Sequence, residues 1–272
     1  MAIHHDRVRV DVADHVATVT LLRADKHNAL DGPMFEGILA AAEEVGSTPG
    51  VRAVVLHGEG PSFCSGLDVG ALMDPESSVS LDDIIERGDR RSNIAQRVAT
   101  DWIDLPMPVI AALHGNVFGG GLQLALGADF RIAAPGATLS VMESRWGLVP
   151  DMAISSTLPR LVRIDIAKEL TYTARKLSGT EAASLGLVTR TADVPLQAAR
   201  ELAAEIAGKS PDAMRAAKRL YDEAWNAPVE EGLLLETELQ RNLIGSKNQM
   251  AAVTAGFTKE PAEFEDPAPV SA

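Results

Sequence analysis

The chain has 272 residues, 46% hydrophobic and 23% charged, a balance that suits one large globular domain, or one domain with a helical appendage, around an aliphatic core. Its net charge of −13 disfavours nucleic acid and anionic membranes as partners, although a few local Lys or Arg residues and backbone amides can still hold a phosphorylated small molecule. The single cysteine, Cys64, excludes an internal disulfide, and the sequence shows neither a leader nor an apolar run of membrane-spanning length, so we expect a cytoplasmic protein.

The first half of the sequence predicts alternating strands and helices. Residues 8–11 and 16–22 indicate a hairpin, and a helix is expected over residues 33–45, with Pro33 in its first turn and Gly46 at its C-cap. Three continuous apolar runs predict parallel strands buried on both faces: residues 51–58, 108–115 and 129–135.

The second half is predicted to be mainly helical. Residues 72–92 are polar and acidic and indicate a loop, which leads into a helix over residues 84–103. Beyond Pro150 the pattern favours a series of helices, at residues 153–173, 180–184, 195–208, 211–226, 229–243 and 247–254. The Pro- and Ala-rich tail from Glu260 is expected to fray. We therefore predict an α/β core over residues 1–195 and a helical region over residues 196–272.

Three stretches with glycine-containing turns follow apolar strands, at residues 58–68, 116–133 and 143–151. Glycine at a strand end lets a ligand approach the main chain, and a helix start supplies N–H groups that lack partners. One N–H from each of the first two turns can therefore converge on one oxygen and form an oxyanion hole, which stabilises a carbonyl as it gains negative charge. The alternative is a plain glycine turn before a buried helix, with Gln123 as a packed amide.

Other chemical motifs are absent from the sequence. It contains no phosphate-binding glycine loop, no G-x-S-x-G elbow and no His/Cys cluster with metal-ligand spacing. His57 and His114 end strands, where an ordinary hydrogen bond explains each of them. Cys64 has no neighbouring base and is interpreted as a small buried side chain.

Five segments resemble, in the same order, segments of the crotonase (enoyl-CoA hydratase/isomerase) superfamily: RADKHNAL, SFCSGLD, HGNVFGGGLQLALGADFRIA, ESRWGLVPD and LSGTEAASLGLV. The resemblance implies an α/β fold, a crotonase-type spiral of ββα repeats with a C-terminal helical trimerisation region, assembled as a homotrimer or homohexamer. It implies an acyl-CoA substrate bound by the core, with coenzyme A as part of the substrate and with no bound cofactor or metal.

The resemblance also assigns site residues. The two oxyanion amides fall on Leu67 and Gly120. Contacts to coenzyme A are expected from two early segments, the glycine triplet and a late lysine: Lys26, Asn28, Ala29, Ser65, Gly66, Asp68, Val69, Gly70, Gly119 and Lys259.

The reaction depends on which carboxylates are present. Hydratases of the superfamily carry glutamates at the positions of Gln123 and Glu143, and an amide cannot take a proton from water. Members that shift a double bond often keep only the equivalent of Glu143. Asp151 resembles a second catalytic carboxylate of dienoyl-CoA isomerases, although it is equally well explained as a helix N-cap. Arg145 and Trp146 either shape the acyl pocket or simply pack.

Several alternatives remain open at this point. The preferred one is double-bond isomerisation of an enoyl- or dienoyl-CoA by Glu143, with Asp151 as a second acid. The next is hydration of a 2-enoyl-CoA, with Gln123 orienting the water, and a third is acyl-CoA binding without turnover. In an interpretation without acid/base chemistry, Glu143 is a surface carboxylate that follows a strand. A serine peptidase on the same spiral would need a Ser-His-Asp arrangement that the sequence does not offer.

Overall fold

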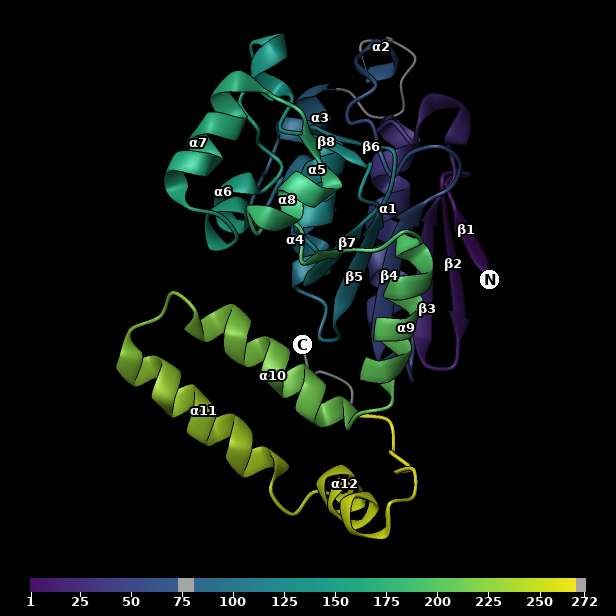
Figure 1. The fold of residues 1–272 in the computed structure, drawn as a ribbon, viewed down its shortest axis with the longest axis vertical. Coiled ribbons are helices and arrows are strands. Elements are labelled where there is room, and N and C mark those ends of the chain that lie inside the picture. Colours follow the sequence, from purple (N-terminus) through teal and green to yellow (C-terminus); the bar gives the residue numbers. More distant parts are fainter. Residues whose placement is uncertain (73–80, 268–272) are drawn as a thin grey trace.

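The computed structural model describes residues 1–72 and 81–267 and contains two β-sheets with helices around them (Figure 1). The larger sheet has seven strands in the order β1 (Ala2–His4), β2 (Val8–Ala13), β3 (Val16–Leu21), β4 (Ala53–Gly58), β5 (Val109–Leu113), β7 (Phe130–Ala133) and β10 (Arg190–Thr191). The smaller sheet has three, in the order β6 (Asn116–Phe118), β8 (Thr138–Ser140) and β9 (Leu177–Ser178).

The helices of the first half are α1 (Gly32–Ser47), α2 (Val69–Leu72), α3 (Leu81–Ile85), α4 (Ile94–Ile103) and α5 (Gly120–Leu126). Those of the second half are α6 (Ile154–Thr157), α7 (Ile164–Thr173), α8 (Gly179–Ser184), α9 (Pro195–Ala207), α10 (Pro211–Ala224), α11 (Val229–Leu243) and α12 (Lys247–Thr258). Three short 3₁₀ turns complete the described elements: η1 (Ala24–Lys26), η2 (Glu143–Trp146) and η3 (Leu158–Arg160). Within the described residues, no helix combines the length and apolar character needed to cross a bilayer.

The chain alternates between the two sheets as it advances. Strand β5 in the large sheet is followed by β6 in the small one and then by α5, and β7 is followed by β8 in the same way. Because β4, β5 and β7 are parallel neighbours, as are β6 and β8, each turn stacks on the previous one. This arrangement is the spiral of ββα repeats that the sequence predicts.

The core lies on both faces of the large sheet, as the continuous apolar runs predict. Val54 and Leu56 point into the main core cluster beneath α1 and α4, whereas Ala53 and Val55 point to the opposite face. That second face is covered by α9 through Ala199 and Ala203, among others. The alternation follows from the period of two in a strand, which sends successive side chains to opposite faces.

Two of the predicted helices are wrong in extent. The helix expected over residues 84–103 is divided, because Asn93 caps α4 in a reciprocal capping box with Gln96 and the chain is left-handed at Gly88. The helix expected over residues 153–173 is divided into α6, η3 and α7, with Pro159 in the first turn of η3. The loop expected over residues 72–92 lies partly outside the described residues.

The ends of two other helices also differ from the prediction. Helix α1 begins with Pro33 in its first turn, as expected, but it continues through Gly46 and is capped by Thr48. Helix α12 extends four residues past the predicted Thr254, to Thr258, where Lys259 adopts the left-handed capping conformation.

The C-terminal helices are fastened to the core by buried side chains. Lys218 of α10 forms an ion pair with Asp129, 2.8 Å away, and also donates to the carbonyls of Trp102 and Met107. The Arg52 guanidinium donates to the carbonyl of Phe264 at 2.9 Å.

The tail as far as Pro267 is therefore held. Asn248 accepts from the N–H of Glu265 and donates to its carbonyl, which adds to the bond between Arg52 and Phe264. The expectation that the chain frays from Glu260 is wrong for this part.

Candidate active site

Two loop segments that are far apart in sequence run side by side at one edge of the candidate site. The N–H of Leu30 donates to the carbonyl of Gly66, and the N–H of Asp68 donates to the carbonyl of Leu30, which makes Leu30 and Leu67 partners in an isolated parallel bridge. The N–H of Ser65 also donates to the carbonyl of His27. These bonds bring together most of the residues that the sequence predicts to contact coenzyme A.

The same pairing determines the direction of the Leu67 N–H. In an extended segment alternate residues direct their backbone groups to opposite sides, so the neighbours of Leu67 bond to Leu30 while Leu67 itself points away. Among the described residues none accepts a hydrogen bond from this N–H. A Cβ on Gly66 would lie 3.5 Å from the nitrogen of Gly120 and 2.8 Å from the carbonyl oxygen of Phe118. The first glycine turn therefore lies against the second.

Close packing requires the glycines of the second turn. Gly119 has a positive φ of 51°, and a Cβ there would lie 3.2 Å from Oε1 of Glu143. A Cβ on Gly120 would lie 2.7 Å from the sulfur of Met152, and one on Gly121 would lie 2.5 Å from the carbonyl oxygen of Cys64. Gly120 begins α5, so its N–H has no partner within the helix, and no other described residue accepts from it.

Gln123 and Glu143 form a hydrogen-bonded pair beneath these glycines. The amide Nε2 of Gln123 donates to Oε1 of Glu143 at 2.7 Å, and the backbone N–H of Met152 donates to Oε1 of Gln123 at 2.8 Å. Because a backbone N–H is only a donor, the Met152 contact fixes which end of the amide faces Glu143. Gln123 is 1% exposed, so its polar atoms meet protein rather than bulk water.

Glu143 keeps one carboxylate oxygen free. It is buried, and Oε2 has no hydrogen-bond partner among the described residues. Burial raises the pKa of Glu143; donation from neighbouring amides, including that of Gln123, opposes the rise, and the nearby charge of Asp151 adds to it. A carboxylate with a raised pKa and a free buried oxygen is suited to take and return a proton.

Asp151 is not a helix cap. The N-cap of α6 is Ala153, two residues further on, and it has no side-chain capping bond. Burial of the Asp151 carboxylate raises its pKa, although the residue as a whole is exposed. Arg145 and Trp146 do not pack into the core, because both are exposed, Trp146 to 70%.

The residues expected to contact coenzyme A differ in what they can offer. Lys26 is exposed, and Val69 and Gly70 are exposed at the start of α2. Asn28 is fully buried: its amide bonds the N–H of Arg23 and the carbonyls of Glu59 and Ser62, and its own N–H donates to the carbonyl of Arg23, so it supports the loop rather than touching a ligand. Lys259 follows α12, which lies away from α2 and α5, so a single chain does not bring Lys259 to this site (Figure 1).

The remaining titratable candidates have ordinary roles. Burial raises the pKa of the Cys64 thiol to about 12, consistent with an inert buried side chain. His57 bonds Thr20 and the carbonyl of Gly58, and burial lowers its pKa to about 4; His114 bonds the carbonyl of Gly60. The predictions for these three residues are confirmed.

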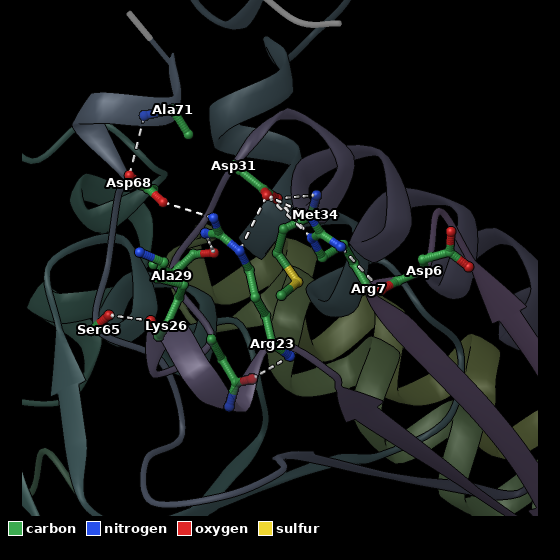
Figure 2. A network of polar contacts seen from close by, with 11 residues as sticks. Asp6, Arg7, Arg23, Lys26, Ala29, Asp31, Met34, Ser65, Asp68 and Ala71 are labelled. Carbon is green, nitrogen blue, oxygen red and sulfur yellow. Dashed lines mark hydrogen bonds and ion pairs between the residues drawn. The ribbon is translucent and has the colours of Figure 1, made fainter. Parts of the chain in front are cut away.

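Two residues of the site, Met152 and Arg23, are missed by sequence reasoning. Met152 fixes the Gln123 amide, and Arg23 lies between the carboxylates of Asp31 and Asp68 behind the first glycine turn (Figure 2). Arg23 belongs to the segment RADKHNAL that the sequence singles out, but its partners are revealed only by the fold.

Comparison with known proteins agrees with this geometry. The model of the family described as Enoyl-CoA hydratase/isomerase matches residues 11–267. The chain is similar to the mitochondrial methylglutaconyl-CoA hydratase of Mus musculus, with 30% identity over 257 residues that cover 92% of this chain and 79% of that protein. It is similar to the mitochondrial delta(3,5)-delta(2,4)-dienoyl-CoA isomerase of Rattus norvegicus, with 31% identity over 272 aligned residues that cover 94% and 81%.

The fold is matched as well. The crystal structure of an enoyl-CoA hydratase from Bacillus anthracis superposes with a TM-score of 0.85 at 30% identity, covering 95% of this chain and 98% of that one. The chain therefore belongs to the enoyl-CoA hydratase/isomerase family, the crotonases, as an acyl-CoA enzyme with the α/β fold and C-terminal helices of that family.

Proposed function

We propose that the protein moves a double bond within an enoyl- or dienoyl-CoA thioester, with Glu143 as the acid and base. The observation that carries this proposal is the state of Gln123. The amide oxygen of Gln123 accepts from the N–H of Met152 and its nitrogen donates to Glu143, but an amide is not basic enough to take a proton from an attacking water. Glu143 Oε2 is left as the free carboxylate oxygen beside the glycine turns.

The chemistry needs only one base. Glu143 removes a proton from the carbon next to the thioester carbonyl, and the electron pair of that C–H bond moves onto the carbonyl oxygen as an enolate. The N–H groups of Leu67 and Gly120 stabilise that charge. The far carbon of the conjugated system then gains a proton, either the one that Glu143 took or, in a dienoyl substrate, one given by protonated Asp151. In the second case Glu143 afterwards loses its proton to solvent and Asp151 regains one, which restores both groups. No atom is gained or lost.

The second candidate is hydration of a 2-enoyl-CoA. It is supported by the similarity to methylglutaconyl-CoA hydratase and by the second N–H of Gln123, which can donate to a water. In this reaction Glu143 alone would have to activate the water. The third candidate, binding of acyl-CoA without turnover, fits poorly with a base that is kept buried and free.

Assembly through the C-terminal region is part of the proposal. We propose a homotrimer, or a homohexamer made of two trimers, because α10, α11 and α12 leave large apolar side chains exposed: Tyr221, Trp225, Leu233, Leu234 and Phe257. Contact between copies of the chain would remove these side chains from water, which supports assembly through the C-terminal region. The mass in solution, measured by light scattering, decides between a monomer and these assemblies. The cytoplasmic location and the division at residues 195 and 196 remain predictions.

A substrate panel tests the reaction. The protein is incubated separately with crotonyl-CoA, a 3-enoyl-CoA and a 3,5-dienoyl-CoA, while the absorbance of the conjugated thioester is followed. We expect growth of conjugated absorbance from the 3-enoyl or the dienoyl substrate, and loss of that activity in Glu143→Gln. Rapid loss of crotonyl-CoA absorbance that survives Asp151→Asn but not Glu143→Gln would favour the hydratase. Tight binding without turnover of any of the three would favour the binder.

A further inference from the structure

We propose that Arg23 is a positioning residue of the oxyanion hole, holding the turn that carries the Leu67 N–H by an ion pair with Asp68. The inference rests on the proposed function in one respect, namely that the Leu67 N–H is a donor to the thioester oxygen. The Arg23 side chain is 13% exposed and is surrounded by protein groups, so it acts through Asp68 rather than by touching the reacting atoms.

Each nitrogen of the Arg23 guanidinium has its own partner. Nη2 lies 2.8 Å from Oδ2 of Asp68, Nη1 donates to the carbonyl of Ala29 at 3.0 Å, and Nε lies 3.3 Å from Oδ2 of Asp31. Figure 2 shows the guanidinium between the two carboxylates, with the loop of Ala29 beside it. One planar group thus ties together the loop before α1, the start of α1 and the turn before α2.

Asp68 connects the Arg23 guanidinium to the segment that carries the Leu67 N–H. It follows Leu67 directly, its N–H bonds to the carbonyl of Leu30, and its Oδ1 accepts from the N–H of Ala71. The peptide that contains the Leu67 N–H is therefore held on one side by the bridge to Leu30 and on the other by Arg23 through the Asp68 side chain. Without Arg23, the bridge between Leu30 and Leu67 remains, but the Asp68 side chain is no longer held by an ion pair.

The structure contains a matched control. Arg7 binds Asp31 from the other side, with Nη2 2.9 Å from Oδ2, in the same network (Figure 2). Its polar contacts are to Asp31 and to the carbonyl of Asp6, and neither Asp68 nor Ala29 is among its partners. Arg7→Gln therefore disturbs the cap of α1, as Arg23→Gln does, without touching the oxyanion turn.

The experiment measures the carbonyl group that the hole would bind. The probe is butyryl-CoA labelled with ¹³C at the thioester carbonyl, which has no double bond to move, and the readout is its C=O stretching frequency by isotope-edited infrared difference spectroscopy. Hydrogen bonds from the hole lower this frequency in the wild-type complex. We expect it to return toward the solution value in Arg23→Gln, to recover in part in Arg23→Lys, and to stay at the wild-type value in Arg7→Gln.

Kinetics supply an independent readout. We expect kcat for the isomerised substrate to fall roughly tenfold or more in Arg23→Gln, because small displacements of a catalytic group are costly, with a smaller change in KM. The double variant Arg23→Gln/Asp68→Asn should be no slower than the worse single variant, since both changes remove one interaction. If Arg23→Gln does not fold, Arg23→Lys and Asp68→Asn carry the same comparison.

The outcomes separate the two proposals. If the wild-type protein binds butyryl-CoA without lowering its C=O frequency, the oxyanion hole and the proposed function fail together. If the wild-type frequency is lowered and Arg23→Gln leaves it unchanged, or if Arg7→Gln raises it equally, only the positioning role of Arg23 is overturned.

Discussion

The candidate site has a helix half and a loop half that are held by different forces. The helix half consists of Gly120, Gln123 and Glu143, which are buried and fixed by close packing and by hydrogen bonds. The loop half consists of Leu67 and Asp68, which lie nearer the surface and are fixed by the bridge to Leu30 and by ion pairs with arginine.

The difference teaches where each half is vulnerable. A side-chain atom added at a packed glycine collides with its neighbours. An ion pair is instead weakened by substitutions that remove a charge, even when they keep the shape of the side chain. The two N–H groups proposed to bind one oxygen can therefore be disturbed separately, one by steric and one by electrostatic substitutions. Five predictions use this separation.

The largest effect is expected from Glu143→Gln in the helix half. Removing the base should lower kcat by about 10²- to 10⁴-fold while acyl-CoA binding persists, as measured by turnover and by calorimetry. Glu205 is an exposed carboxylate on α9, and the control variant Glu205→Gln should change neither kcat nor the affinity for acyl-CoA. Retained turnover in Glu143→Gln would contradict the assignment of the base.

The same variant has a second, opposite effect on stability. Because the pKa of Glu143 is raised in the folded state, its contribution to stability is present below the pKa of the unfolded chain and is lost as pH rises through the folded pKa. Glu143→Gln should therefore resist urea better than the wild type at neutral pH, with the difference disappearing in acid. Equal stability at both pH values would argue against a buried, perturbed carboxylate.

Next in size is the steric test of the helix half. Alanine at Gly121 would place a Cβ 2.5 Å from the backbone oxygen of Cys64, so Gly121→Ala should lower the free energy of unfolding by about 1–3 kcal/mol. Gly136 has open space around it and serves as the control, since Gly136→Ala meets nothing within 4 Å. Urea midpoints that fall equally in both variants would show that packing is not the cause.

The loop half should respond to charge with a smaller effect. Burial pushes the pKa of Asp68 up, but the N–H of Ala71 and the ion pair with Arg23 outweigh it, so the pKa lies below the ordinary value. A depressed pKa gives stability above the unfolded pKa that is lost as pH falls through the folded one. Asp68→Asn should cost about 1 kcal/mol at neutral pH and nothing in strong acid, as measured by unfolding at several pH values. If Asp68→Asn remains less stable than the wild type in acid, the cause is the shape of the side chain rather than its charge.

The smallest effect concerns the rim of the helix half. The charge of Asp151 contributes to the raised pKa of Glu143, so Asp151→Asn should move the acidic limb of the pH–rate profile of a 3-enoyl substrate to lower pH, by less than about one unit. A large loss of kcat with a 3,5-dienoyl substrate alone would identify Asp151 as its second proton donor. An unchanged profile with both substrates would leave Asp151 outside the site.

Local pattern predicted five strands, β2, β3, β4, β5 and β7, and most helices, because their signals lie within one segment. It missed β1, β6 and β8, which have only three residues each. The apolar runs around Leu56 and Ile110 are buried on both faces, as their composition indicates. Strands β9 and β10 have two residues each, too short for any period to show. The sequence analysis missed the division of the helix expected after Pro150, because apolar spacing does not show the non-helical backbone at Arg163, which separates η3 from α7.

For the candidate site, the sequence predicted which backbone N–H groups are left without a partner among the described residues, but not what holds them in place. The free N–H groups of Leu67 and Gly120 follow from glycine turns and a helix start, which are local features. The supports join segments that are distant in the chain: Met152 reaches Gln123, and Arg23 reaches Asp68. Such pairs are decided by tertiary packing, so one sequence alone does not reveal them.

The buried ion pair between Lys218 and Asp129 has a practical consequence for dissecting the molecule. A protease cut in the short connection around Lys209 would separate the last three helices from the core covalently, yet Lys218, and Arg52 with the carbonyl of Phe264, would still bind the two pieces to each other. Parting them would break the ion pair between Lys218 and Asp129 and the hydrogen bonds that Lys218 and Arg52 donate across the two pieces. Two separately expressed fragments divided there should therefore reassemble, which makes this connection a suitable split point for a complementation reporter.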